Sequence, residues 1–352
     1  MSRRIERLRG LMRREKLDGF VITHLPNVRY LCGYTGSNGL ILVTRGDCWF
    51  YTDFRYAEQI RTEVKGCRKR VLVRDLVSHP PPEWGRTYRR LGVEESHVTL
   101  GRFKQFRKRF SKARLVPTRD LVLELRRTKE PAEVTLIADA QRVTDRVFGE
   151  VLKMVKPGVR ERDLALEIEF QFRKHGEVAF DSIVASGENA AKPHAGFSKR
   201  KLRKGDALTF DIGCRIAGYC SDMTRTVFVG KAPPELRRVY EIVHEAQRRA
   251  LETIKPGTTA KAADAAAREY ITEQGYGKRF GHSLGHGVGI EVHELPTLAA
   301  TGKETLAPGD VVTVEPGVYL PGVGGVRIED MVHVTRTGYA NLTRSPKRLI
   351  EL

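Results

Sequence analysis

The chain has 352 residues, of which 40% are hydrophobic and 30% are charged, the composition of an ordinary globular protein long enough for two domains. No apolar run reaches the length of a membrane span, and residues 1–8 lack the apolar core of a signal peptide, so we expect a cytoplasmic protein without a membrane partner. The cysteines form no CxxC pair, which favours reduced, structural thiols over a disulfide framework or a thiol nucleophile; they are Cys32, Cys48, Cys67, Cys214 and Cys220.

The net charge of +19 lies mainly in the first third of the chain. Residues 1–125 contain 27 Lys and Arg against 13 Asp and Glu, whereas residues 126–352 contain 35 against 30. The basic runs at 68–70 and 102–114 lack the interleaved aromatic and glycine pattern of a nucleic-acid-binding module. A solvated basic face is therefore favoured, and we predict no nucleic-acid partner.

The first segment alternates between helical and strand patterns. An amphipathic helix is predicted at 5–16 and another helix from residue 56 onward, and buried strands are predicted at 19–23, 39–44 and 48–52. This alternation predicts an α/β layer, which we assign to residues 1–125.

A second segment follows a predicted link at 121–130. Pro131 begins a long helix, in which apolar residues recur at helical spacing from 134 to 152. We assign residues 126–352 to a second domain.

Landmarks within this second domain recur at a constant shift of 99 residues. A Lys-Pro-Gly string precedes a helix that ends at a glycine, and a histidine follows 18 residues later. The two sets are Lys156-Pro157-Gly158, Gly176 and His194, and Lys255-Pro256-Gly257, Gly275 and His293. The recurrence predicts two copies of one helix–strand unit.

Acidic residues occupy matched positions in the two copies. Asp211 corresponds to Glu315 at a shift of 104, and Asp222 corresponds to Glu329 at a shift of 107. If the halves pack face to face, four carboxylates meet near a pseudo-twofold axis. Such buried carboxylates repel one another and stay ionised only with cations among them, so the pattern predicts bound divalent metal.

One histidine has no partner in this scheme. His286 lies in the string Gly285-His286-Gly-Val-Gly289, where the first copy holds Gly187. Four carboxylates and one imidazole suit two Mn²⁺, Co²⁺ or Fe²⁺ ions better than a thiolate-rich zinc site would, and Zn²⁺ remains open. Taken singly, an Asp at a strand end or a buried His is more typical of packing, so the prediction rests on the joint pattern.

The five residues, in this order and in these contexts, resemble the proline-specific pita-bread metallopeptidases, aminopeptidase P and prolidase (Xaa-Pro dipeptidase). The resemblance is carried by Lys192-Pro193-His194-Ala195, Thr209-Phe-Asp211-Ile-Gly213, Ser221-Asp222-Met-Thr-Arg225-Thr226, Gly285-His286-Gly-Val-Gly289, Val292-His293-Glu294-Leu-Pro296, Glu315-Pro316-Gly317 and Val326-Arg327-Ile-Glu329-Asp330. The N-terminal string Asn27-Val-Arg-Tyr30-Leu-Cys-Gly33 resembles the creatinase-like domain of the same proteins. The implied fold is α/β (α+β), with a creatinase-like domain followed by a pita-bread domain of two pseudo-twofold-related halves.

The resemblance also implies roles for individual residues. Asp211 would hold one metal ion, Asp222 and Glu329 would bridge both ions, and His286 and Glu315 would complete the second. Further residues would act on the substrate or line the site: Glu315 as a proton shuttle, His194 and His293 beside the substrate with His293 at the oxyanion, and Arg327, His282 and Tyr319 around them.

The implied activity is a metallo-exopeptidase that cleaves the Xaa-Pro bond of short peptides with proline second, in a homodimer. No positive charge follows the His-Glu-Leu-Pro string before Lys303, which favours an aminopeptidase over a dipeptidase. Three alternatives stay open. They are a methionine aminopeptidase, which shares the ligands but lacks the N-terminal domain, a metal-independent creatinase-like amidinohydrolase, and a non-catalytic histone-chaperone type of binding module.

Overall fold

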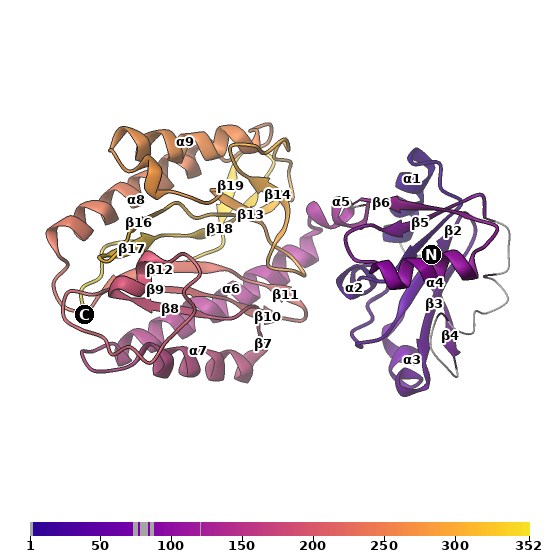
Figure 1. Cartoon of the computed structure of the whole chain (residues 1–352), viewed down its shortest axis with the longest axis horizontal. Helices are drawn as coiled ribbons and strands as arrows, with labels where there is room; N and C mark the ends of the chain where they lie inside the picture. The colour runs from indigo at the N-terminus through magenta and orange to yellow at the C-terminus, as the bar shows by residue number, and fades with distance from the viewer. Residues whose placement is uncertain (1–2, 73–76, 78–83, 85–87, 120) are drawn as a thin grey trace. The chain divides into compact units, whose positions relative to one another are not determined.

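The computed structural model describes residues 3–72, 77, 84, 88–119 and 121–352. The chain divides into two compact units, unit 1 (Met1–Arg126) and unit 2 (Arg127–Leu352), which we describe separately (Figure 1). Among the described residues, none of the helices combines the length and apolar character that crossing a bilayer requires.

Unit 1 is built on a six-stranded mixed sheet with the strand order β4-β3-β2-β1-β5-β6. Its strands are β1 (Gly19–Ile22), β2 (Leu40–Thr44), β3 (Cys48–Asp53), β4 (Arg68–Leu72), β5 (Arg90–Glu94) and β6 (Arg114–Thr118). Its helices are α1 (Arg3–Arg14), α2 (Leu25–Cys32), α3 (Gln59–Glu63), α4 (Leu100–Arg109) and most of α5 (Leu121–Arg127). Apolar residues of β1, β2 and β5 pack with Trp84, Phe106 and Phe110 in one core.

The predicted α/β layer and its first three strands are confirmed, and two predicted segments differ. The stretch 121–130 is not a simple link, because it contains α5, whose residues Leu121, Val122 and Leu125 form a buried face. The helix expected from residue 56 is short, since a 3-10 turn at Phe54–Tyr56 precedes the five residues of α3.

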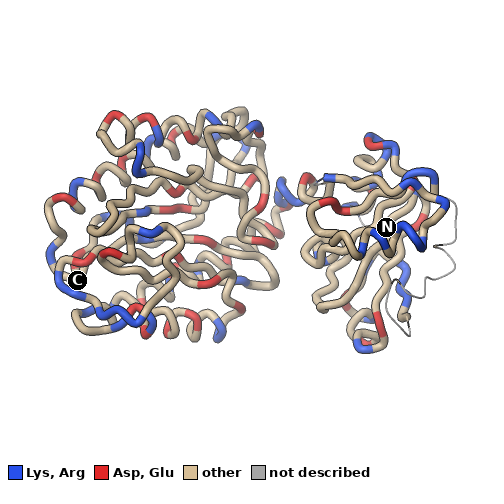
Figure 2. The backbone as a smooth tube through the Cα atoms, in the orientation of Figure 1, with Lys and Arg blue, Asp and Glu red and all other residues tan. Residues whose placement is uncertain are grey.

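The basic runs lie on exposed elements of unit 1. Figure 2 shows Lys and Arg gathered along α4 and β4. The residues of β4 at 68–71 are exposed on the edge strand of the sheet, and α4 buries only Phe106 within its bounds. The basic side chains of these two elements are therefore mostly exposed to solvent.

Two cysteines depart from the expectation of free thiols. Cys48 at the start of β3 and Cys67 directly before β4 form a disulfide. The parallel pairing of β3 with β4 aligns Trp49 with Arg68, which brings the preceding residues of both strands side by side with their Cα atoms 4.8 Å apart. The free cysteines among the described residues are buried: Cys32, Cys214 and Cys220.

Unit 2 places helices outside and strands inside. Figure 1 shows α6 (Pro131–Val151) and α7 (Glu161–His175) on one side of the strands, and α8 (Pro234–Thr253) and α9 (Ala260–Glu273) on the other. The strands are β7 (Glu177–Val178), β8 (Ile183–Ser186), β9 (Ala207–Ile212), β10 (Cys214–Ile216), β11 (Tyr219–Cys220), β12 (Met223–Phe228), β13 (Gly285–Gly287), β14 (Glu294–Leu298), β15 (Val311–Val314), β16 (Gly317–Leu320), β17 (Gly324–Arg327), β18 (Asp330–Val334) and β19 (Tyr339–Asn341). They form a five-stranded sheet of order β14-β13-β15-β18-β19, two three-stranded sheets of orders β12-β9-β8 and β11-β10-β7, and the pair β16-β17.

The internal repeat appears in the structure as matching hydrogen bonds. Gly158 and Gly257 both adopt positive φ, 91° and 89°, and each donates its backbone N–H to a leucine carbonyl 2.9 Å away, Leu202 in the first half and Leu306 in the second. Asp206 and Asp310 likewise accept equivalent backbone hydrogen bonds, from Arg203 and Ala307. Unit 2 therefore contains the two predicted pseudo-twofold-related halves.

The strand registers correct how the sequence paired the acidic residues. Asp211 on β9 lies opposite Thr224 on β12. In the second half Val314 lies opposite Asp330, so the next pair along the same ladder is Glu315 with Glu329. The structural counterpart of Glu329 is therefore Thr224, and the predicted match with Asp222 is wrong by two residues because the connections between strands differ in length.

The same comparison corrects the partner of His286. Ser186 pairs with Leu208 in the first half, and Gly287 pairs with Val312 in the second. Since Leu208 and Val312 are counterparts, the residue before Ser186, Ala185, occupies the place of His286. The predicted counterpart, Gly187, lies beyond the strand in a 3-10 turn.

The two positive-φ glycines provide a test of the repeat. A Cβ added to Gly158 or Gly257 meets no atom within 4 Å, so substitution changes only the backbone energy. We expect Gly158→Ala and Gly257→Ala each to lower the free energy of unfolding by about 1–2 kcal/mol, the cost of a left-handed alanine. Gly149→Ala, at an exposed position inside α6 with equal space, should raise it by about 0.5–1 kcal/mol. Urea denaturation measures all three, and a stabilised Gly257→Ala variant would contradict the assigned turn.

Candidate metal centre

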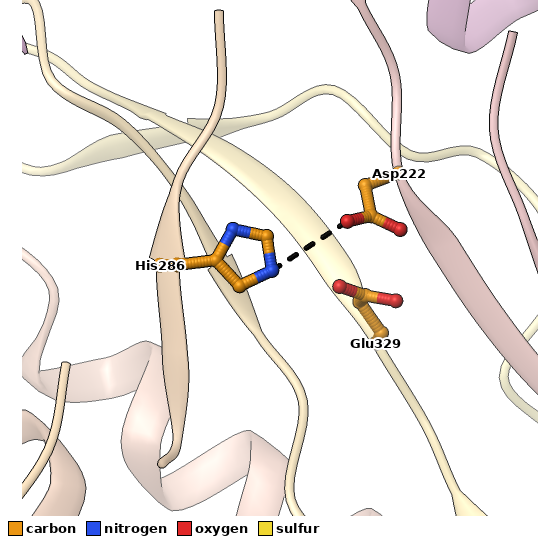
Figure 3. A group of neighbouring side chains, drawn as sticks. All are labelled: Asp222, His286 and Glu329. Carbon is orange, nitrogen blue, oxygen red and sulfur yellow. Dashed lines mark ion pairs between the residues drawn. The ribbon is translucent and has the colours of Figure 1, made fainter. Parts of the chain in front are cut away.

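Carboxylates and one imidazole from both halves of unit 2 converge between the strands. Ligand atoms of Asp222, His286 and Glu329 all lie within 4.8 Å of one another. Figure 3 shows that the three side chains point toward one another from different strands. Asp222 directly precedes β12, His286 lies on β13, and Glu329 directly precedes β18. Strand ends from the two halves thus meet at one place.

The other two predicted ligands join this group through polar contacts. His286 Nε2 lies 3.2 Å from Glu315 Oε1 and 3.6 Å from Asp222 Oδ2. Asp211, at the end of β9, accepts a hydrogen bond of 2.6 Å from Arg327 Nη2. The structure therefore brings all five residues to one region, linked directly or through Arg327.

The donor set fits divalent cations. Glu329 is buried, and no donor among the described residues reaches its Oε1 atom. An unpaired buried carboxylate oxygen is costly, and a cation would satisfy it. Oxygen ligands with one imidazole suit Mn²⁺ and related ions, so the residues present fit a metal centre.

The orientation of His286 agrees with a ligand role. Its Nδ1 lies 3.1 Å from the carbonyl oxygen of Gly287, an arrangement in which Nδ1–H donates to that carbonyl. The Nε2 atom faces Asp222 and Glu315, and once it gives up its proton to make way for a cation, its lone pair points at the same place. Fixing the tautomer through the second ring nitrogen is typical of metal-binding histidines.

Burial and repulsion set the pKa values of the carboxylates. Burial, and then the charges of neighbouring carboxylates, raise the pKa of Asp222 and Glu329 well above the ordinary value. Burial also raises the pKa of Asp211, although Arg327 opposes it. Burial acts in the same direction on Glu315, but the hydrogen bond and charge of His286 outweigh it and lower the pKa of this carboxyl to about 2. Asp222 and Glu329 are therefore the two carboxyl groups whose ionised form the surroundings disfavour most strongly.

A hydrogen-bonded chain connects three more of the predicted residues to Asp211. Arg327 Nη1 donates to the Tyr319 hydroxyl at 2.8 Å, and this hydroxyl lies 2.9 Å from His282 Nε2. His282 Nδ1 lies 2.8 Å from the carbonyl oxygen of Ser283. Burial lowers the pKa of His282, which favours the neutral ring that this chain requires.

His293 and His194 are exposed at the same site. The His293 ring packs against the His286 ring with 4.3 Å between centroids. Partial burial of its ring, followed by the charge of His286, lowers the pKa of His293, and the charge of His194 acts in the same direction. His194 therefore lies near His293, but no direct contact joins either ring to Asp211 among the described interactions.

The sequence did not point to two threonines that touch the ligands. Thr313 donates its hydroxyl hydrogen to Glu315 Oε1 at 3.1 Å, and Thr224 donates to Glu329 Oε2 at 2.7 Å. The signal that could have found Thr224 is strand alternation, since Asp222, Thr224 and Thr226 project to one face of a strand.

A buried, shared cage of carboxylates with one imidazole, built on two duplicated halves, defines a metal-dependent hydrolase centre. The model of metallopeptidase family M24 matches residues 135–336, and that of the creatinase/prolidase N-terminal domain matches residues 4–128. The chain belongs to metallopeptidase family M24. The predicted resemblance and fold class are thereby confirmed.

Several relatives match over nearly their whole length. The Xaa-Pro dipeptidase of Pyrococcus horikoshii is 33% identical over 99% of this chain and 99% of its own. The structure of the Xaa-Pro dipeptidase from Bacillus anthracis superposes with a TM-score of 0.96 at 40% identity, covering 99% of each chain. That of the X-Pro aminopeptidase from Thermotoga maritima gives a TM-score of 0.86 at 34% identity, covering 96% of this chain and 98% of that one.

Replacing Asp222 tests the electrostatics of the cage. Because its pKa is raised in the folded protein, ionised Asp222 destabilises the metal-free fold above the ordinary carboxyl pKa of about 4. We expect Asp222→Asn to melt at a higher temperature than the unmodified chain at pH 7 with chelator, and the difference to shrink toward pH 4. Added Mn²⁺ should reverse the order, since the unmodified chain gains more stability from binding.

Thermal denaturation with and without Mn²⁺ measures both effects. Glu150→Gln, at an exposed position on α6, is the control and should follow the unmodified chain under all conditions. An Asp222→Asn variant that gains as much stability from Mn²⁺ as the unmodified chain would contradict a ligand role.

Proposed function

We propose that this metallopeptidase removes the residue in front of proline from the N-terminus of short peptides, using two divalent ions, with Mn²⁺ as the first candidate. The observation that carries the proposal is the convergence of Asp211, Asp222, His286, Glu315 and Glu329 in one buried cage. The full-length similarity to Xaa-Pro dipeptidases and to an X-Pro aminopeptidase supports the choice of bond.

The chain's own residues supply most of the proposed chemistry. Two bound ions would lower the pKa of a shared water and polarise the scissile carbonyl. Glu315 accepts the proton of the attacking water and passes it to the leaving nitrogen. His293, whose lowered pKa keeps the ring neutral near pH 7, donates an N–H to the oxygen on which negative charge develops.

Hydrogen bonds link Arg327, Tyr319 and His282 and hold these side chains in place beside Asp211. The nitrogen in front of proline belongs to a tertiary amide without an N–H, so recognition depends on the ring itself. We propose that His282 and Tyr319, whose rings lie 5.6 Å apart, contribute to the surface that receives the substrate.

The length of the peptide after proline is the open variable. The sequence after Pro296 favours an aminopeptidase, whereas relatives at comparable identity carry the names of both activities. The cytoplasmic location inferred from the sequence and the homodimer implied by the resemblance stand as proposals beside the activity.

Substrate choice tests the proposed function directly. We expect the Mn²⁺-loaded protein to release alanine from Ala-Pro, from Ala-Pro-Ala, or from both, and to leave Ala-Ala and Met-Ala-Ser intact. Comparing kcat/KM for the first two peptides separates dipeptidase from aminopeptidase. Amino-acid release measured by chromatography, with and without EDTA, provides the assay.

Two results would overturn this function. Hydrolysis of Ala-Pro that continues in excess EDTA would exclude a metal mechanism, and preferential release of methionine would favour the methionine aminopeptidase alternative. Retention of the protein on DNA with a steep salt dependence, without hydrolysis, would favour the binding-module alternative.

His293 provides a test of oxyanion stabilisation. We expect His293→Ala to lower kcat about 10²-fold with a smaller change in KM, because the lost hydrogen bond forms mainly in the transition state. His175→Ala, at an exposed position at the end of α7, is the control and should leave both constants unchanged. A His293→Ala variant with unchanged kcat would contradict the assigned role.

A further inference from the structure

Thr224 lies where the two halves of unit 2 meet and touches both of them. Its side chain is fully buried on β12, opposite Asp211 of its own half. Its hydroxyl lies 2.7 Å from Glu329 Oε2 and 3.1 Å from Arg327 Nε, both of which belong to the other half. Its backbone carbonyl accepts the N–H of Glu329 at 3.0 Å.

The direction of these hydrogen bonds follows from the donor chemistry of each group. A guanidinium nitrogen can only donate, so Arg327 Nε uses the Thr224 oxygen as an acceptor. The single hydroxyl hydrogen of Thr224 is then free to point at Glu329 Oε2, which can only accept while the carboxylate is ionised. One arrangement of hydrogens satisfies all three groups.

The result is a directed relay between two predicted metal ligands of different halves. Arg327 donates through Nη2 to Asp211 and through Nε to Thr224, and Thr224 donates to Glu329. Glu329 keeps its Oε1 atom without a donor among the described residues. The relay therefore holds one oxygen of Glu329 and leaves the other for a cation.

We propose that Thr224 is a positioning residue of the metal centre, which fixes the carboxylate of Glu329 and couples it through Arg327 to Asp211. This role rests on the two-metal site proposed above. Partners of this kind commonly change metal affinity by 10–100-fold when they are removed. Without the hydroxyl, Glu329 loses its donor and Arg327 Nε loses its acceptor, both in a buried place.

The duplication gives the role a further basis. Thr224 and Glu329 are structural counterparts that meet at the pseudo-twofold axis, and so are their neighbours Arg225 and Asp330, which form a buried ion pair of 2.8 Å. At both of these adjacent positions a donor in the first half faces an acceptor in the second. Thr224 thus occupies a place where an acidic residue would be the fifth carboxylate of the site, and it supplies a hydrogen instead.

Mn²⁺ binding to three variants tests the proposal. Thr224→Val keeps the shape of the side chain and removes the hydroxyl, Thr224→Ser keeps the hydroxyl, and Thr226→Val is the matched control. Thr226 is equally buried two residues along β12, and its hydroxyl binds the backbone of Arg327 and the side chain of Thr209 without touching a ligand carboxylate.

We expect calorimetry of Mn²⁺ binding to show 10–100-fold weaker binding of at least one ion for Thr224→Val, and values within about 3-fold of the unmodified chain for Thr224→Ser and Thr226→Val. The visible spectrum of Co²⁺-loaded protein should change only for Thr224→Val. Thr224→Ala, which introduces no new methyl group beside the carboxylate, replaces Thr224→Val if that variant does not fold.

The outcomes separate this role from the proposed function. An unmodified chain that binds no Mn²⁺ would overturn the metal site itself. Two ions bound with unchanged affinity and spectrum by Thr224→Val would overturn the role of Thr224 alone. Equal weakening in Thr224→Val and Thr226→Val would also overturn it, because loosening of β12 would then explain the loss.

Discussion

Mutual repulsion among buried carboxylates is the constraint on which unit 2 depends. Asp222 and Glu329 are almost inaccessible to solvent, and burial, followed by the charges of neighbouring carboxylates, raises the pKa of both groups. The backbone holds them there because each directly precedes a strand anchored in a separate sheet. Because the two carboxylates cannot move apart, the fold provides a preorganised binding site for cations.

The positive groups around the cage divide the carboxylates into two classes. Arg327 lies against Asp211, and His286 lies against Glu315, so these two acids have partners supplied by the protein. Asp222 and Glu329 have much weaker contacts with positively charged side chains. A cation bound between these two carboxylates would therefore neutralise the charge that the protein itself leaves uncompensated. This division agrees with the terminal and bridging roles that the family resemblance implied for Asp211 and for the pair.

Much of the site could be predicted because duplication leaves a trace in the sequence. The recurring Lys-Pro-Gly strings indicated two halves, and local strings singled out five candidate ligands that the structure brings to one region. The exact correspondence between the two halves could not be predicted, because connections of unequal length separate the strands. Only the strand registers show that Thr224 is equivalent to Glu329 and that Ala185 is equivalent to His286. Hydrogen-bond partners such as Thr224 and Thr313 were also missed, since a threonine on a strand is ordinary until its neighbour across the sheet is known. The Cys48–Cys67 disulfide was missed for the same reason, because it depends on the pairing of β3 with β4.

The meeting of Thr224 with Glu329 has a consequence for the origin of this architecture. Two halves encoded by a single gene and related by a true twofold axis would be obliged to place the same side chain on both sides of that axis, either two hydroxyls or two acids. Two separate copies of the coding sequence allow a mutation to alter one half and spare the other. Duplication is therefore a precondition for the present unequal pair, and with it for a centre whose two ends differ chemically.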